Sequence, residues 1–436
     1  MITNGVNLVQ WLDNLSSEPT RTISWLSNEN LEMMRADGIE TLRIPLDPVL
    51  LTNGTFNEWN PSLLAILEDR LAKMLEMGFT VILNAWKYGA GTPVMSEIIL
   101  NNSRNGKGSL PATFAAYFHL FRELVSRYPE AIESGKLVVD IIDETGSNIK
   151  TKEGLAVKDA LVAKSYTDTI LDTILLLRGA KETANLAIDI PVHGWHAIES
   201  FRVIAPEFKE KLSHLPMLHV AVQQWEPWVI THASSVAHGL GGLTGLPWPL
   251  TEDSAAPILE RLTAIGDVAT ADKLRAIIPS DFSTLDERMK MCKEISGLCG
   301  IPARLSGFGL IRAGCTEEAG NAYIRDMTKA ANKHGIGWNI WQAYANIYGE
   351  ETRPNKDYGI YDRVRWGGPD NFKLLRNPDR LAALDLWKEP VTPPEPPEPE
   401  PPSPSPPKQP QGCAFALLAL VQSVGASFFF MSTRNR

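Results

Sequence analysis

Cysteine is scarce in this chain of 436 residues, which has only Cys292, Cys299, Cys315 and Cys413. No two of these residues have the short spacing of a metal-binding motif, so we expect neither a metal site nor a bound cofactor. Cys292 and Cys299 lie seven residues apart on a predicted helix. That spacing is typical of thiols buried in a core.

A positive net charge is also lacking, because 42 Lys and Arg stand against 51 Asp and Glu, for a formal net charge of −9. No cluster of basic residues offsets this excess, which argues against binding to nucleic acid. The chain does contain 12 Trp. An acidic, Trp-rich protein suits neutral sugars better than polyanions.

The N-terminus shows no export signal. Met1 leads almost directly into GVNLVQW (5–11), which already has the pattern of a strand.

One unit recurs along the chain, namely an amphipathic helix, a glycine and a short apolar strand. In residues 60–86, for example, Asn60 and Pro61 suit the first turn of a helix and Gly78 suits its left-handed end. The segment FTVILNAW then follows as a strand. Repetition of this unit is typical of a parallel sheet covered by helices.

Eight segments qualify as strands, and their nearly continuous apolar character fits strands buried on both faces. They are 4–11, 39–45, 79–86, 137–144, 186–192, 217–225, 301–308 and 335–344. The simplest architecture is an α/β fold with one (β/α)₈ barrel over residues 1–388. An open, doubly wound sheet is the alternative. The long insertion at 238–284 follows the sixth strand, and such loops commonly shape the cleft of a barrel.

The C-terminal part has a different composition. Residues 389–411 are rich in proline and should form an extended linker. In residues 412–436, the apolar run CAFALLALVQSVGASFFFM is just long enough to cross a bilayer as a helix, at about 1.5 Å per residue. Its Gly-Cys start resembles short bacterial sorting signals, and a simple tail anchor is the alternative. Both predict attachment to a membrane or cell envelope. Two locations of the barrel stay open. A barrel outside the cell would need export, and a barrel that is not exported would face the cytosol.

On a (β/α)₈ barrel, the active residues come from the C-terminal ends of the strands. The residues predicted at those ends are Arg43, Trp86, Glu144, His193 or Trp195, Gln223 with Trp225, Gly307 and Trp341. Indole faces stack on the C–H faces of pyranose rings, and carboxylates and amides bind the hydroxyls. The set therefore predicts a sugar site, although any single Trp could equally pack under a loop.

Six stretches between Gly5 and Trp387 carry a resemblance to a known family. They are GVNLVQWL, TLRIPLDP, LVVDIIDETG, QQWEPWVITHASS, PARLSGFG and IGWNIWQAYANIYG. Together they resemble glycoside hydrolase family 5, the cellulase-type β-glycanases. The resemblance implies that Arg43 is the arginine beside the nucleophile, Glu144 the acid/base and Trp341 the sugar platform.

The departures from the family pattern fall in the catalytic centre. Gly307 stands where the nucleophilic glutamate is expected, and Asp143 replaces the asparagine before the acid/base. Trp86 stands where the family has a histidine on the third strand. Gln223 and Trp225 stand where it has a histidine and a tyrosine on the sixth. The resemblance thus implies a substrate-binding site at these positions with a degraded catalytic centre.

A retaining glycosidase needs two carboxyl groups about 5–5.5 Å apart, and glycine cannot supply one. Without the nucleophile, Arg43 would lose its anionic partner, and we expect Glu144 to take that place or to survive as an acid. Strand alternation should turn Asp143 away from Glu144. A base for an inverting reaction would have to come from a loop residue such as Glu252 or Asp253.

Three hypotheses remain open. The first is a β-glycan-binding protein with little or no retaining hydrolysis, since Trp86 and Trp225 enlarge the stacking surface. The second is an active O-glycosyl hydrolase that uses Glu144 as acid/base with a relocated second carboxylate. The third is a non-catalytic surface scaffold. Released reducing sugar would favour the second hypothesis, and failure to bind any glycan would favour the third.

Overall fold

The computed structural model describes residues 4–9, 11–12, 26–86, 112–143, 160–192, 198–235, 238–343, 359–365 and 372–386. Residues Met1–Lys388 belong to one compact unit. The predicted linker (389–411) and apolar segment (412–436) lie outside the described residues and stay predictions. Within the described ranges, no helix combines the length and apolar character needed to cross a bilayer.

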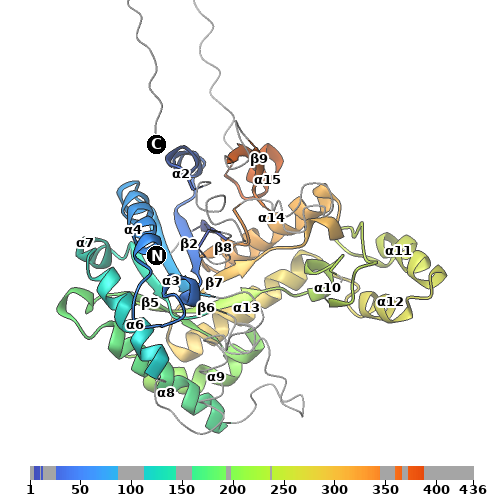
Figure 1. The fold of residues 1–436 in the computed structure, drawn as a ribbon. Coiled ribbons are helices and arrows are strands. Elements are labelled where there is room, and N and C mark those ends of the chain that lie inside the picture. The colour runs from blue at the N-terminus through green and yellow to red at the C-terminus, as the bar shows by residue number, and fades with distance from the viewer. Residues whose placement is uncertain are drawn as a thin grey trace, which may run out of the picture. The chain divides into compact units, whose positions relative to one another are not determined.

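Eight parallel strands close into a barrel in the order of the sequence (Figure 1). They are β1 (Asn4–Asn7), β2 (Thr41–Leu46), β3 (Thr80–Ala85), β4 (Leu137–Asp140), β5 (Ala187–Pro191), β6 (Leu218–Gln224), β7 (Ala303–Phe308) and β8 (Trp338–Ile340). Closure comes from β1 and β8, whose ladder pairs Asn4 with Trp338 and Gly5 with Asn339. The predicted (β/α)₈ barrel is therefore confirmed, and the open sheet is wrong.

Helices surround the barrel. They are α2 (Asn28–Ala36), α3 (Pro48–Leu51), α4 (Pro61–Glu76), α6 (Ala112–Val125), α7 (Pro129–Glu133), α8 (Ala160–Leu177), α9 (Ile198–Lys211), α10 (Trp228–Thr231), α11 (Glu252–Ala264), α12 (Val268–Arg275), α13 (Phe282–Cys299), α14 (Glu317–Lys333) and α15 (Pro378–Ala383). Helix α4 begins as predicted, because the Asn60 side chain accepts hydrogen bonds from the amides of Ser62 and Leu63. It ends before Gly78, whose φ of +83° suits glycine.

The predicted insertion at 238–284 contains α11 and α12, and α10 lies just before it. Helices α11 and α12 form a hairpin that stands out at the right of Figure 1. The Thr251 side chain caps α11. Trp248 anchors the base of the insertion, because its Nε1 donates a hydrogen bond to Asp326 Oδ2 of α14 at 2.9 Å. A role of this insertion in shaping a cleft stays a prediction.

The last described residues, 359–365 and 372–386, form a C-terminal clasp. It consists of α15 and an antiparallel hairpin of β9 (Tyr361–Arg365) and β10 (Phe372–Arg376). Two clasp side chains bind Asp37 at the end of α2, namely Tyr361 Oη at 3.1 Å and Arg376 Nε at 2.7 Å. The clasp thus joins the last residues of the barrel to its first helix.

The centre of the clasp is Arg380, whose side chain is fully buried. Its Nε donates to Glu317 Oε1 on α14 at 2.6 Å, and its Nη1 donates to Asp362 Oδ1 and to the Gly359 carbonyl, both at 2.9 Å. The guanidinium therefore links three segments of the chain at once.

Replacing Arg380 by methionine should lower the free energy of unfolding by about 2–4 kcal/mol, because a buried carbonyl and two carboxylates lose a charged donor. Urea unfolding of the full chain measures this change. The matched control is Arg376→Gln, since the Arg376 side chain is 43% exposed and its ion pair should contribute less than about 1 kcal/mol. Equal losses in the two variants would contradict this view of the clasp.

Candidate functional site

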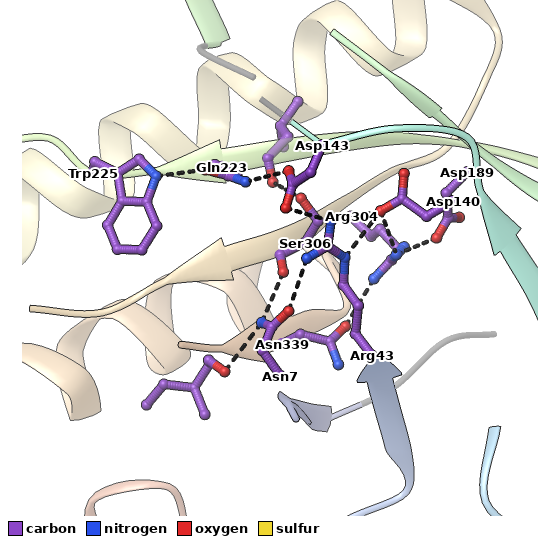
Figure 2. Close-up of polar contacts among 12 residues, drawn as sticks. Asn7, Arg43, Asp140, Asp143, Asp189, Gln223, Trp225, Arg304, Ser306 and Asn339 are labelled. Atoms are coloured by element: carbon purple, nitrogen blue, oxygen red, sulfur yellow. Dashed lines mark hydrogen bonds and ion pairs between the residues drawn. The ribbon is translucent and has the colours of Figure 1, made fainter. Parts of the chain in front are cut away.

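Four charged side chains meet inside the barrel (Figure 2). They are Arg43 from β2, Asp140 from β4, Asp189 from β5 and Arg304 from β7, and none is more than 2% exposed. Arg43 donates from Nε and Nη2 to Asp140 Oδ2, at 2.9 and 2.8 Å. Arg304 Nη2 binds Asp189 Oδ2. Barrel interiors are usually filled by branched apolar side chains, so this one is unusually charged. This charged layer was not predicted from the sequence.

Two asparagines complete this layer at the seam of the barrel. Asn7 on β1 accepts from Arg43 Nη1 at 2.9 Å and donates to the carbonyls of Ser306 and Ile340, at 3.0 and 3.2 Å. Asn339 on β8 accepts from Arg304 Nη1 at 2.8 Å. The seam therefore holds both guanidinium groups in a fixed orientation.

The buried charges do not balance. Asp143 adds a third carboxylate, against the two guanidinium groups of Arg43 and Arg304. Burial raises the pKa of Asp140 to about 7, although Arg43 acts in the opposite direction. Asp140 Oδ1 has no hydrogen-bond partner among the described residues, so it can carry a proton.

Asp189 behaves in the opposite way. Burial acts to raise its pKa, but Arg304 and His219 outweigh that effect and hold the pKa below its ordinary value. His219 Nδ1 lies 3.4 Å from Asp189 Oδ1. Of these two carboxyl groups, Asp140 is therefore the one that more readily carries a proton.

At the mouth of the barrel, a chain of contacts leads from Arg43 to an indole ring (Figure 2). Arg43 Nη2 lies 2.9 Å from Asp143 Oδ2. Gln223 Nε2 donates to Asp143 Oδ1 at 2.7 Å, and Trp225 Nε1 donates to Gln223 Oε1 at 2.6 Å. Asp143 and Gln223 are only 3% and 4% exposed. Three of the predicted site residues thus belong to one hydrogen-bonded group with Arg43.

Asp143 takes a place that the sequence did not predict for it. We expected Glu144 to replace the lost anionic partner of Arg43, and the partners in the described part of the chain are Asp140 and Asp143. The prediction relied on strand alternation as far as residue 144, but β4 ends at Asp140. Glu144 itself lies outside the described residues, as do His193 and Trp195.

Gly307 lies near the end of β7, opposite Gln223 of β6, just after a register shift between Val222 and Gln223. A Cβ atom at Gly307 would lie 3.6 Å from Gln223 Cγ and 3.6 Å from Trp225 Cζ2. The space into which a longer side chain would extend is therefore bordered by Gln223 and Trp225. The position expected for a nucleophile has no carboxylate of its own.

The other two predicted tryptophans lie together. Trp86 follows β3 and Trp341 follows β8, and their ring centroids are 5.5 Å apart with planes at 77°. Trp225 packs edge-on against His232 instead, at 5.8 Å. All three indoles are partly exposed. That the three line one sugar-sized volume stays a prediction.

An aromatic cluster that was not predicted from the sequence continues from Trp225 along the segment after β6. Trp228, His232 and His238 lie within 4.8–5.0 Å of one another, measured between ring centroids. Thr231 Oγ1 donates to the Trp225 carbonyl at 2.6 Å, which ties the cluster to the site. Burial lowers the pKa of His232 to about 4 and also lowers that of His238, so both rings are neutral at pH 7.

The residues proposed for an inverting reaction lie on the insertion. Glu252 and Asp253 are exposed in the first turn of α11. A catalytic role for either stays a prediction. Across the described ranges, no group of three or more His, Cys, Asp or Glu side chains could hold a metal ion.

Comparison with known proteins gives a likeness of structure alone. No family model and no curated protein matches the sequence. A broad-specificity GH5-4 endoglucanase from Bacteroides salanitronis has a TM-score of 0.63 at 15% identity, over 88% of this chain and 92% of the other. The cellulose synthase subunit Z of Clostridioides difficile has a TM-score of 0.60 at 15% identity, over 88% and 99%. Thermotoga maritima Cel5A with mannotriose has 0.60 at 16%, over 88% and 97%. The chain therefore has the (β/α)₈ barrel fold of the cellulase-like glycoside hydrolases.

Proposed function

We propose that the barrel mouth binds β-glycan and catalyses little or no retaining hydrolysis. The observation that carries this proposal is Gly307, which supplies no carboxyl group and faces Gln223 and Trp225. Glycine cannot form the covalent intermediate of a retaining enzyme. The carboxylate of Asp143 is no substitute, because it is buried and bound by Arg43 and Gln223.

Binding is favoured by the aromatic side chains that remain. The edge-to-face pair of Trp86 and Trp341 leaves both indoles partly exposed, and Trp225 presents a third. Partly exposed indoles can stack on the apolar faces of pyranose rings. The fold adds support, since structures of Thermotoga maritima Cel5A were solved with cellobiose and with mannotriose.

Replacing Trp86 or Trp341 by alanine should weaken the binding of cellohexaose by about 1–2 kcal/mol, which corresponds to about 5–30-fold in Kd. Isothermal titration calorimetry with the full chain measures the change. Trp59→Phe is the control, because Trp59 is partly buried against the core, where it packs on Tyr117 and Phe121. A wild-type protein that binds neither cello- nor manno-oligosaccharides would refute the proposal and favour a scaffold.

The alternative is hydrolysis with Glu144 as acid/base and a relocated second carboxylate. A reducing-sugar assay on the same samples separates it from binding alone, because our proposal expects no release of reducing ends. Hydrolysis lost in Glu144→Gln would favour the alternative. Hydrolysis with retention that survives in Glu144→Gln would overturn the assignment of the site.

We also propose that residues 412–436 attach the protein to a membrane or cell envelope, with residues 389–411 as an extended linker before them. This part of the proposal is supported by the sequence alone.

A further inference from the structure

We propose that Gln223 is a positioning residue that holds the indole of Trp225 as a sugar-stacking face, with Asp143 and Arg43 fixing the orientation of its amide. This inference rests on the proposed function, and it adds how one stacking face is kept in place. The observation behind it is the unbroken series of contacts from Arg43 through Asp143 and Gln223 to Trp225.

The chemistry of the neighbours determines which way the Gln223 amide faces. The indole Nε1–H of Trp225 is only a donor, so it must meet the amide oxygen. The carboxylate of Asp143 is only an acceptor while ionised, so it must meet the amide nitrogen. Arg43, 2.9 Å from Asp143, favours that ionised state. A side chain between these two groups must donate at one end and accept at the other, as glutamine does.

The hydrogen bond to Trp225 is not needed for packing. An indole that is partly exposed can give its N–H to water, at little cost in stability. Here the N–H is instead held at 2.6 Å by an amide that is only 4% exposed. A bond of this kind fixes the direction of the ring, which matters for a ligand that stacks on it.

Gly307 belongs to the same arrangement. Its missing side chain leaves room for Gln223 Cγ and Trp225 Cζ2, each 3.6 Å from where a Cβ would lie. The absence of a longer side chain at position 307 therefore suits the glutamine and the tryptophan at positions 223 and 225.

A charge exchange tests the inference. In Gln223→Glu, two carboxylates would meet where an amide now donates to Asp143, and like charges in contact are strongly unfavourable. We expect the Kd for cellohexaose to rise at least about tenfold, with a changed near-ultraviolet circular dichroism of tryptophan. Adding Asp143→Asn should restore both signals, because the new amide donates to one oxygen of the introduced carboxylate while Trp225 donates to the other.

Two further measurements keep the result decisive. Gln223→Met removes both hydrogen bonds without adding charge, and it should raise the Kd about three- to tenfold while leaving Tm within a few degrees of wild type. The inference is overturned if Gln223→Glu binds like the wild type, or if the double variant recovers Tm but not the tryptophan signal. If the wild type binds no glycan, the proposed function fails. The tryptophan signal of the three variants then still decides whether Gln223 positions Trp225.

Discussion

Replacing Asp140 by asparagine should stabilise the protein at pH 8, by about 1–3 kcal/mol. The folded barrel holds the pKa of Asp140 at about 7, above the value of 3.8 that we take for the unfolded chain. Between these two values the folded state binds a proton that the unfolded chain releases, so wild-type stability falls as pH rises through this window. Asparagine keeps an oxygen for Arg43 and removes the excess charge. Urea unfolding from pH 5 to pH 8 should show a flatter profile in the variant.

Asp189→Asn is the matched control, because Asp189 pairs with Asp140 across the β4–β5 ladder and is equally buried. Its pKa is lowered in the folded state, so its contribution to stability is present above its unfolded pKa and is lost at lower pH. Removing that charge leaves Arg304 with only the carboxylate of Asp140, 4.0 Å away, which should cost about 2–4 kcal/mol at pH 8. Effects of the same sign in the two variants would contradict the assignment of the proton to Asp140.

Introducing glutamate at Gly307 should give at most weak retaining hydrolysis and should weaken cellohexaose binding at least about tenfold. The Cβ of the new side chain would lie 3.6 Å from Gln223 Cγ and from Trp225 Cζ2, so we expect the longer side chain to displace the indole. It also adds a carboxylate near Asp143, where the buried charge is already negative. We expect the free energy of unfolding to fall by about 1–3 kcal/mol at pH 8. Aryl β-glycoside hydrolysis, calorimetry and urea unfolding measure the three effects.

Gly307→Ala separates loss of space from introduction of charge. Its Cβ would make ordinary contacts at 3.6 Å, so stability and affinity should stay close to those of the wild type. Efficient retaining hydrolysis by Gly307→Glu would show that the rest of the catalytic machinery survives. The site would then have lost only its nucleophile.

The fold could be predicted because its evidence is local. The repeated unit of helix, glycine and apolar strand can be recognised from neighbouring residues. Each predicted strand has its counterpart in the barrel. Three strands end earlier than predicted, namely β1 at Asn7, β4 at Asp140 and β8 at Ile340. LVVDIIDETG continues an apolar pattern beyond Asp140, and nothing in the sequence marks where the ladder with β5 stops.

The charged interior could not be predicted, because its partners come from distant strands. Asp189 and Arg304 are 115 residues apart, and each is a single charged residue within an apolar strand. From the sequence, such a residue could equally face solvent at the end of a strand. Its partner is known only once the barrel is closed. By contrast, the resemblance at PARLSGFG implied from sequence alone that a carboxyl is missing at Gly307. The neighbours that border its space depend on a register shift between β6 and β7.

The seam of the barrel has a consequence for how the chain is made. Asn7 binds the carbonyl of Ile340, 333 residues later in the sequence, and it also holds Arg43. Until β8 has been synthesised, the edge of β1 that pairs with it is open, and the interior ion pairs are not enclosed on that side. Contacts of such long range form slowly, and an open parallel edge can pair with other chains. The interval before Trp338–Ile340 leaves the ribosome is therefore the period in which this protein is most exposed to aggregation.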